Sequence, residues 1–224
     1  LGFGCMRLPV ANGNSEEIDD AVFCRMIDHY MEQGFVYFDT AYPYHNQKSE
    51  EAVRRCLVER YDRERFLLAD KMPVWLVQNM EDYSEIFERQ LARCGVTYFD
   101  FYLFHAMNKT RVEETEKTGG FAFVQRMKTE GRIRHIGFSF HDTAEALEEI
   151  LKKRILSTLF LQKRRQGRFG MPASPSMIRR RFCMKFWMPP TGTLFSSRSI
   201  IMTGSRRMCS PANAMRLPKS MVYR

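Results

Sequence analysis

The chain has 224 residues, of which 44% are hydrophobic and 27% are charged, and this suits a globular protein of one or two domains. No apolar run approaches the ~20 residues of a membrane-spanning helix, so we expect no membrane partner. The first residues, LGFGCMRLPV, show neither an initiator Met nor a secretion signal, and we expect a fragment.

The net charge of +9 is distributed unevenly along the chain. Residues 1–153 carry all 26 acidic residues and 20 of the 35 basic residues, whereas residues 154–224 carry the other 15 basic residues and no acid. A globular domain of that length without a carboxylate departs strongly from average composition. We therefore expect one structured unit over 1–153 and an aberrant basic tail over 154–224.

The cysteines are scattered and form no CxxC pair. This spacing argues against a zinc or iron–sulfur site in this chain and against a disulfide framework. We therefore expect no metal and a reducing, cytoplasmic setting. The six cysteines are Cys5, Cys24, Cys56, Cys94, Cys183 and Cys209.

The first elements alternate between strand and helix patterns. Residues 2–6, GFGCM, form a short opening strand and lack the third glycine of a dinucleotide-binding fingerprint. Apolar residues at helical spacing then predict a helix over 15–34, with Ser15 as its cap and Gly34 as its stop. Residues 36–41, VYFDTA, read as a short buried strand.

The alternation continues through the middle of the chain. A second helix is predicted over 48–61, with Ser49 at its start and acidic residues in its first turn, where the helix dipole favours them. A strand over 66–72 and a helix over 81–95 follow. Residues 98–105, YFDFYLFH, are again a near-continuous apolar run and predict a strand.

The last predicted elements are a helix over 121–131, a strand over 133–140 and a helix over 143–153. The count is then five strand–helix units. Apolar strands separated by amphipathic helices predict parallel pairing, with helices covering the sheet. A doubly wound sheet and a (β/α)8 barrel both fit this pattern.

Polar residues follow four consecutive predicted strands, at or just past their carboxyl ends: Asp39, Lys71, His105 and Ser139. Barrel enzymes build their active sites from that rim. The fold class we expect is therefore α/β, a partial (β/α)8 TIM barrel of about five units, followed by an irregular tail.

Tyr44 follows Asp39 by five positions, and these two residues with Lys71 and His105 suit acid–base chemistry. A tyrosine with a pKa of ~10 is a poor proton donor near neutral pH. A neighbouring ammonium favours the phenolate and lowers that pKa, and a carboxylate can hold the ammonium in place. A histidine can hydrogen-bond a carbonyl. The set predicts general acid catalysis as hydride arrives from a nicotinamide.

The motifs FDTAYPYHNQKSE, LLADKM, FDFYLFH and GRIRHIGFSFHD resemble the aldo-keto reductases, in the order that the family shows them. The resemblance covers residues 1 to about 153 and is greatest to a bacterial branch that often carries a C-terminal iron–sulfur module. It implies that Tyr44 is the general acid, Lys71 its partner and Asp39 the counter-ion of that lysine. His105 would orient the carbonyl. Ser139, together with Asp39, would contact the cofactor.

Two positions depart from the family pattern. Asp70 precedes Lys71 where the family often has Thr or Ser, and His45 follows Tyr44 where Gly is frequent. Tyr42 and Trp75, in the adjacent loops, are candidates for the wall of the substrate pocket or for rim packing.

The basic tail invites a nucleic-acid hypothesis through RRQGRF, IRRRF and GSRRM, but it has no helical or strand periodicity. Back-translated and read one base earlier, LFSSRSIIMTG (194–204) can encode FVQLQINYYDW, which resembles the sixth strand of these reductases. A frame-shifted SMIRRRFCMKFW (176–187) can encode HDTAEVLYEIL, which differs from residues 141–151 at two positions. We expect an out-of-frame translation over the tail and no nucleic-acid partner; the coding DNA tests this.

The sequence thus predicts an NADPH- or NADH-dependent oxidoreductase that reduces an aldehyde or ketone, with a small-molecule carbonyl as its partner. With five of eight units, this chain alone is expected to be inactive. Two alternatives remain. A non-catalytic α/β binding module is favoured if Tyr44 and Lys71 lie too far apart to interact. A basic-tailed nucleic-acid-binding protein is favoured by steeply salt-dependent binding to DNA.

Overall fold

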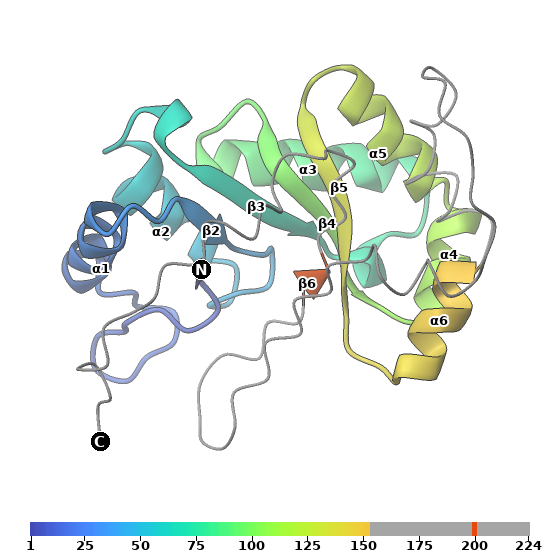
Figure 1. Ribbon diagram of the computed structural model, residues 1–224, viewed down its shortest axis with the longest axis horizontal. Coiled ribbons are helices and arrows are strands. Elements are labelled where there is room, and N and C mark those ends of the chain that lie inside the picture. The colour runs from blue at the N-terminus through green and yellow to red at the C-terminus, as the bar shows by residue number, and fades with distance from the viewer. Residues whose placement is uncertain (153–198, 201–224) are drawn as a thin grey trace, which may run out of the picture.

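The computed structural model describes residues 1–152 and Ser199–Ile200, and the rest of the predicted aberrant tail lies outside the described residues (Figure 1). One sheet contains the strands in the order β1-β2-β3-β4-β5-β6. Strands β1 to β5 pair in parallel. The two-residue strand β6 (Ser199–Ile200) pairs antiparallel to β5.

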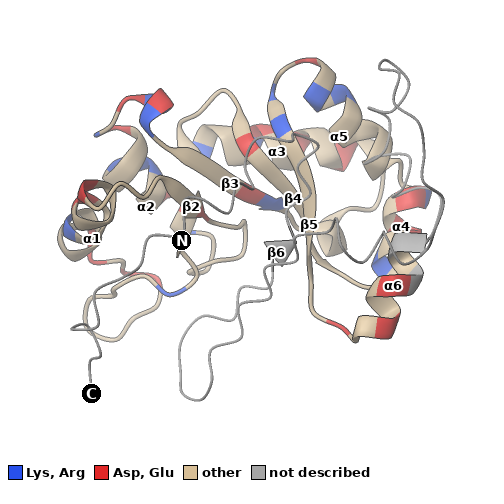
Figure 2. Ribbon diagram, viewed as in Figure 1, with Lys and Arg blue, Asp and Glu red and all other residues tan. Residues whose placement is uncertain are grey.

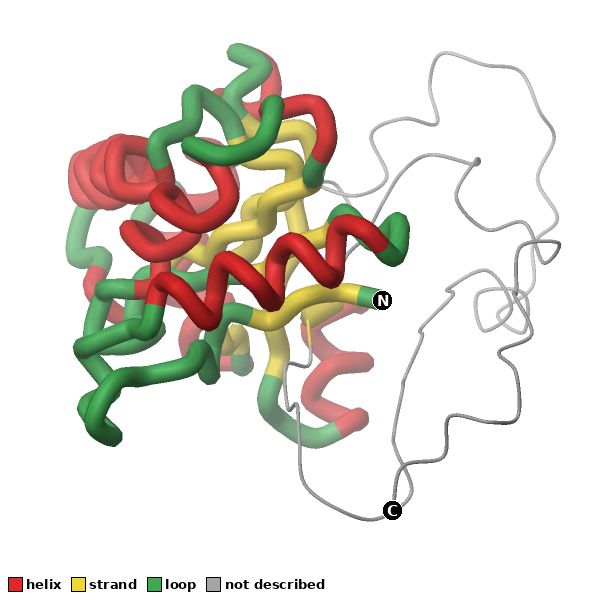
Figure 3. The backbone as a smooth tube through the Cα atoms, turned by 90° about the vertical axis from the view of Figure 1, so that its left-hand side faces the viewer, coloured by secondary structure: helices red, strands yellow, loops and turns green. Residues whose placement is uncertain are grey.

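This strand order decides between the two predicted architectures. A doubly wound sheet reverses its strand order at a switch point and has helices on both faces. Here each of the five parallel strands lies next to its predecessor in the chain. Most helices lie on one side of the curved sheet (Figure 3). The prediction of five parallel units in a partial (β/α)8 barrel is therefore confirmed.

The chain begins with β1 (Gly2–Gly4) and reaches helix α1 (Asp20–Glu32) through a turn. The predicted start of this helix at Ser15 is wrong. Val10 and Ile18 form an antiparallel bridge, so the chain folds back on itself before the helix begins. The Asp19 side chain caps the helix by accepting a hydrogen bond from the Val22 amide at 2.9 Å.

Strand β2 (Tyr37–Asp39) leads into a loop and then into α2 (Ser49–Val53). The predicted single helix over 48–61 is interrupted, because a π-helical turn, η1 (Arg54–Val58), follows α2 directly. The amide of Glu59 donates to the carbonyl of Arg54 at 2.9 Å, five residues back, which defines this wider turn.

Strand β3 (Leu67–Met72) lies between two short 3₁₀ turns, η2 (Arg63–Arg65) and η3 (Val74–Leu76). Helix α3 (Met80–Cys94) then begins at a capping box, in which Asn79 and Asp82 each accept from the other's backbone amide. It ends at Gly95, whose φ of 69° is left-handed and suits glycine. The prediction for this helix is confirmed.

The second half of the described chain contains one element that the sequence pattern missed. Helix α4 (Lys109–Lys117) is largely polar, and only Val112 and Thr115 in it are buried. The other elements are the predicted ones, although β4 runs two residues further than expected: β4 (Phe99–Met107), α5 (Gly120–Thr129), β5 (Ile133–Phe140) and α6 (Ala144–Lys152).

An aromatic core fills the space between the sheet and the helices. Phe87 of α3 lies edge-on to Tyr102 of β4, with ring centroids 5.0 Å apart, and to Phe123 of α5, at 5.7 Å. Each such pair contributes roughly 0.5–1.5 kcal/mol beyond the burial of its apolar area. Most charged residues of the described chain lie on the helices (Figure 2).

Alternation along the strands places polar groups on both faces of the sheet. Side chains at successive strand positions point to opposite faces. In β3, Asp70 points toward α2 and α3, where Glu50 and Cys94 contact it, while Lys71 points to the other face and contacts Asp39. Two neighbouring residues therefore supply two separate polar clusters.

Candidate active site

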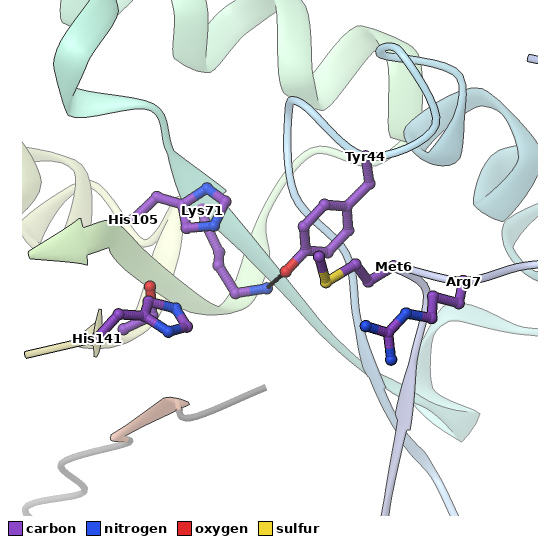
Figure 4. A pocket seen from close by; sticks show the side chains of 7 residues that line it. Met6, Arg7, Tyr44, Lys71, His105 and His141 are labelled. Atoms are coloured by element: carbon purple, nitrogen blue, oxygen red, sulfur yellow. Dashed lines mark hydrogen bonds between the residues drawn. The ribbon is translucent and has the colours of Figure 1, made fainter. Parts of the chain in front are cut away.

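Four of the predicted site residues lie at the carboxyl end of the sheet. Asp39 is the last residue of β2, and Lys71, His105 and Ser139 lie near the ends of the next three strands. Three of the four border one cavity of about 160 Å³ (Figure 4). Its lining consists of Met6, Arg7, Tyr44, Lys71, His105, Ser139 and His141.

Lys71 is the centre of the hydrogen bonding in this cavity. Only 1% of its side chain is exposed, and its ammonium Nζ donates to the Asp39 carboxylate. The same ammonium donates to the Thr40 carbonyl at 2.8 Å and lies 3.2 Å from the Tyr44 hydroxyl. The buried positive charge is therefore paired with one carboxylate and directed at one phenol.

The two partners respond to burial in opposite ways. Burial raises the pKa of Tyr44 above its ordinary 10.0, and the Lys71 ammonium opposes this rise without reversing it. Burial lowers the pKa of Lys71, but Asp39 and Tyr44 outweigh burial, so the pKa lies above 10.5. The structure differs here from the predicted net lowering of the phenol pKa. Lys71 limits the rise, and Tyr44 keeps its proton at neutral pH.

His105 lies beside the phenol as a neutral imidazole. Its ring centroid is 5.8 Å from that of Tyr44. Burial and then the nearby Lys71 charge lower the pKa of His105 from 6.5 to about 3. Its Nδ1 is buried and has no hydrogen-bond partner within the described part of the chain. A neutral ring at this position can donate one N–H to an oxygen in the cavity.

Ser139 closes the far side of the cavity, on β5. Its Oγ accepts a hydrogen bond from the Ala106 amide at 2.6 Å, which leaves its hydroxyl hydrogen to donate elsewhere. Ala106 has a left-handed φ of 53°, at an irregularity in the pairing of β4 with β5 between Phe104 and Met107. This bulge brings the Ala106 amide to the serine.

The loop after Tyr44 is held in an unusual conformation. His45, Asn46 and Gln47 have φ values of 50°, 51° and 71°, and three successive left-handed residues are costly without glycine. His45 offsets this cost because its Nε2 accepts from the Leu8 amide at 2.8 Å, and its Nδ1 lies 2.8 Å from the Ser15 carbonyl. The departure from Gly at position 45 is thus accommodated by side-chain hydrogen bonds.

Three lining residues were missed by the sequence prediction: Met6, Arg7 and His141. Each lies just past the end of a strand, β1 or β5, so the rule for polar residues after strands also applies to Arg7 and His141, whereas Met6 is apolar and falls outside it. The sequence prediction covers the ends of the second to the fifth strands, with only Ser139 at the fifth, and leaves out the first.

The two candidate wall residues lie in different places. The Trp75 ring is 5.2 Å from the His105 ring and is 41% exposed, so it stands beside the cavity. Tyr42 is buried, and its hydroxyl accepts from Arg89 at 3.2 Å. It lines a second cavity, between η3 and α3, so the structure does not bring it to Tyr44.

Comparisons with known proteins agree with the fold. No curated protein matches the chain. A solved aldo-keto reductase from Bacillus halodurans, in its holo form, is 26% identical with a TM-score of 0.54, over 68% of this chain and 49% of that one. One from Klebsiella pneumoniae, in complex with NADPH, is 22% identical with a TM-score of 0.53, over 67% and 48%.

A thermostable aldo-keto reductase in complex with the inhibitor epalrestat is 23% identical with a TM-score of 0.53, over 68% of this chain and 53% of that one. The chain thus spans about half the length of the solved structures it resembles. A model of the aldo/keto reductase family matches residues 1–164. The match covers most of the chain, which therefore belongs to the aldo/keto reductase family.

Proposed function

We propose that this site serves the reduction of an aldehyde or ketone by a nicotinamide cofactor, with Tyr44 as the general acid. The observation that carries the proposal is the 3.2 Å contact between the Tyr44 hydroxyl and the buried Lys71 ammonium, beside a neutral His105. A carbonyl oxygen that receives negative charge needs a proton donor and a hydrogen-bond donor next to it. The cavity offers both.

Each residue has one task in this proposal. Tyr44 gives its phenolic proton to the carbonyl oxygen and becomes a phenolate. The Lys71 ammonium stabilises that phenolate, and Asp39 keeps the lysine charged and aligned. His105 donates an N–H to the same oxygen and fixes the direction from which the carbonyl enters. No proton has to be taken from solvent during the step.

The residues present fit the reacting end of a nicotinamide cofactor, NADPH or NADH. The Ser139 hydroxyl has a hydrogen to donate to a carboxamide, and Asp39 lies at the same rim, at the end of β2. The cofactor would supply the hydride. A cavity of about 160 Å³ is too small for a whole dinucleotide, so the remaining cofactor contacts would come from elsewhere.

The proposed partner is a small-molecule carbonyl compound, without a nucleic acid or a membrane, and the proposed setting is the reducing cytoplasm. Within the described residues no helix is both long and apolar enough for a bilayer crossing. The same residues contain no group of three or more His, Cys, Asp or Glu side chains placed to hold a metal ion. That no metal takes part stays a prediction.

The acid–base part of the proposal is tested by titrating Tyr44 in isotope-labelled chain by NMR, with Tyr44→Phe assigning its signal among the 9 tyrosines. Lys71→Met should raise the Tyr44 pKa further, because the opposing ammonium is gone. Asp39→Asn should lower it, because that carboxylate disfavours the phenolate. Arg25→Met, an exposed charge on α1, is the control and should cause no shift. A Tyr44 pKa that is the same in Lys71→Met as in the wild type would overturn the proposal.

A further inference from the structure

A second polar cluster lies behind β3, on the face of the sheet opposite to Lys71. Glu50 of α2 and Asp70 of β3 are both 0% exposed, and their carboxyl groups are hydrogen-bonded to each other. Two carboxyl groups in contact in a medium of low dielectric cannot both be ionised without a large cost. The contact itself requires a proton between the oxygens, because a carboxylate has no hydrogen to donate.

The partners of the two groups show which one carries the proton. Glu50 accepts from the Gln90 amide at 3.1 Å and from the Arg93 guanidinium at 3.2 Å, a set of donors that favours a carboxylate. Asp70 accepts from the Lys71 backbone amide at 2.7 Å and from the weak Sγ–H donor of Cys94 at 3.8 Å. The Lys71 ammonium is paired with Asp39 on the other face.

The cluster is connected to both residues of the proposed acid–base pair. The Gln90 amide that donates to Glu50 also donates to the Lys71 carbonyl at 3.1 Å, so both peptide groups of Lys71 are held from this side. The Arg93 guanidinium also donates to Gln47 at 3.0 Å, in the strained loop that follows Tyr44. Helix α3 therefore ties the strand of the lysine to the loop of the tyrosine.

We propose that Glu50 and Asp70 share a single proton carried by Asp70, and that this pair is a positioning device that sets Lys71 against Tyr44. A protonated Asp70 supplies the O–H that Glu50 accepts, and its other oxygen accepts from the Lys71 amide. This inference rests on the proposed function of Lys71 and Tyr44. Its infrared test nevertheless measures the protonation of the Glu50–Asp70 pair itself.

Among the buried groups around Asp70, the Glu50–Asp70 pair is the one that changes its protonation state with pH. Burial and then Glu50 raise the pKa of Asp70 well above 3.8, and burial raises the pKa of Glu50 above 4.5. Burial also raises the pKa of Cys94 well above 9.0 and that of Tyr102 well above 10.0, so both stay neutral. The charged groups that act on the pair are Arg93 of α3, which donates to Glu50, and the Lys71 ammonium, which acts from the opposite face of the sheet.

The sign of the pH dependence follows from the raised pKa. The folded chain holds a proton that the unfolded chain releases near pH 3.8, so the contribution of this pair to stability is greatest below that pH. It then falls as pH rises toward the folded pKa, by about tenfold in the folding equilibrium constant per pH unit for one proton. Asp70→Asn cannot ionise and keeps an N–H donor for Glu50. It should be more stable than the wild type at neutral pH and show a flatter pH dependence.

The proton is tested by infrared spectroscopy of the full chain at neutral pH. We expect a carboxylic-acid C=O band in the wild type that Asp70→Asn removes. Asp28→Asn is the matched control, because a hydrogen bond from Arg60 lowers the pKa of Asp28, and this variant should keep the band. A band that survives Asp70→Asn would overturn the assignment of the proton to Asp70.

The positioning role is tested by the Tyr44 titration. Tyr44 titrates above pH 10, where Asp70 can also lose its proton, so the comparison is between two variants that cannot ionise at position 70. Asp70→Asn keeps a donor and an acceptor there. Asp70→Ala removes both, so the Lys71–Tyr44 contact should weaken and the Tyr44 pKa should lie above that of Asp70→Asn.

The outcomes separate the two proposals. A Tyr44 pKa that responds to Lys71→Met but is the same in Asp70→Ala and Asp70→Asn would overturn the positioning role alone. Should Asp70→Ala not fold, the infrared band at neutral pH still decides the state of Asp70: loss of the band in Asp70→Asn supports the shared proton, and survival of the band overturns it. Neither the infrared spectrum nor the Tyr44 titration requires the chain to reduce a carbonyl compound.

Discussion

Lys71 carries a full positive charge into a site where only 1% of its side chain is exposed. Burying an unpaired ammonium is expensive, and the Asp39 carboxylate offsets that cost. The Tyr44 hydroxyl and the Thr40 carbonyl complete the hydrogen bonds of the ammonium. The arrangement that suits proton transfer is therefore also one that the folded state needs.

Lys71→Met should destabilise the chain by about 3–5 kcal/mol, because it leaves Asp39 buried without its counter-ion. The double variant Asp39→Asn with Lys71→Met removes both charges and should recover part of this loss. Urea denaturation at neutral pH gives both free energies of unfolding. Equal stabilities of the single and the double variant would show that the buried carboxylate is not the cause.

His105 gives the site an acid-sensitive group. Its pKa is lowered from 6.5 to about 3, so the unfolded chain binds a proton more readily than the folded chain. Its contribution to stability is fully present above pH 6.5 and is lost as pH falls from 6.5 toward about 3. His105→Gln should show a smaller loss of stability than the wild type over that range in denaturant titrations at several pH values. Identical pH profiles would contradict the buried, neutral histidine.

At the residue scale, the sequence indicated the site because one rule sufficed: polar residues that follow parallel strands meet at one edge. That rule gave Asp39, Lys71, His105 and Ser139. It could not give the cluster of Glu50, Asp70 and Gln90, because these residues meet only through the packing of α2 and α3 on β3. From sequence alone, Glu50 reads as an ordinary acidic residue in the first turn of a helix.

The sequence predicts some helix ends correctly and misses others. The Asn79 capping box and Gly95 are local signals, and α3 lies within one residue of its predicted bounds. The start of α1 depends on the bridge between Val10 and Ile18, a contact that no cap rule includes. Helix α4 buries too few apolar residues for its period to be recognised.

Gly95 offers a test at this scale. Its φ of +69° is left-handed, and a Cβ there would lie 3.0 Å from Cγ of Arg54. Gly95→Ala should therefore cost about 1–2 kcal/mol for the backbone, and more because Arg54 must move. Gly131→Ala, with a φ of +78° and nothing within 4 Å, isolates the backbone cost. Thermal or urea unfolding of both variants measures the difference. Equal losses in the free energy of unfolding would mean that the Arg54 side chain moves aside without cost.

The described sheet is open as a whole. In the described part of the chain β1 is an edge strand, whereas closure of a barrel pairs the first strand with the last and removes both edges. The order β1 to β5 nevertheless aligns the ends of the strands, so the proposed acid–base residues assemble without closure. What the described part lacks is the remaining wall around a cofactor, since it corresponds to about half of the solved relatives.

We therefore expect the purified 224-residue chain to oxidise NADPH in the presence of an electron-poor aldehyde, such as para-nitrobenzaldehyde, no faster than its Tyr44→Phe variant. The reason is that hydride transfer needs both reactants held and shielded from water, whereas the described residues supply the proposed proton donor and one side of the cavity. The measurement is the absorbance of NADPH at neutral pH, with cofactor binding followed by fluorescence. A rate that requires Tyr44 would mean that this open sheet, with the rest of the chain, already completes the site.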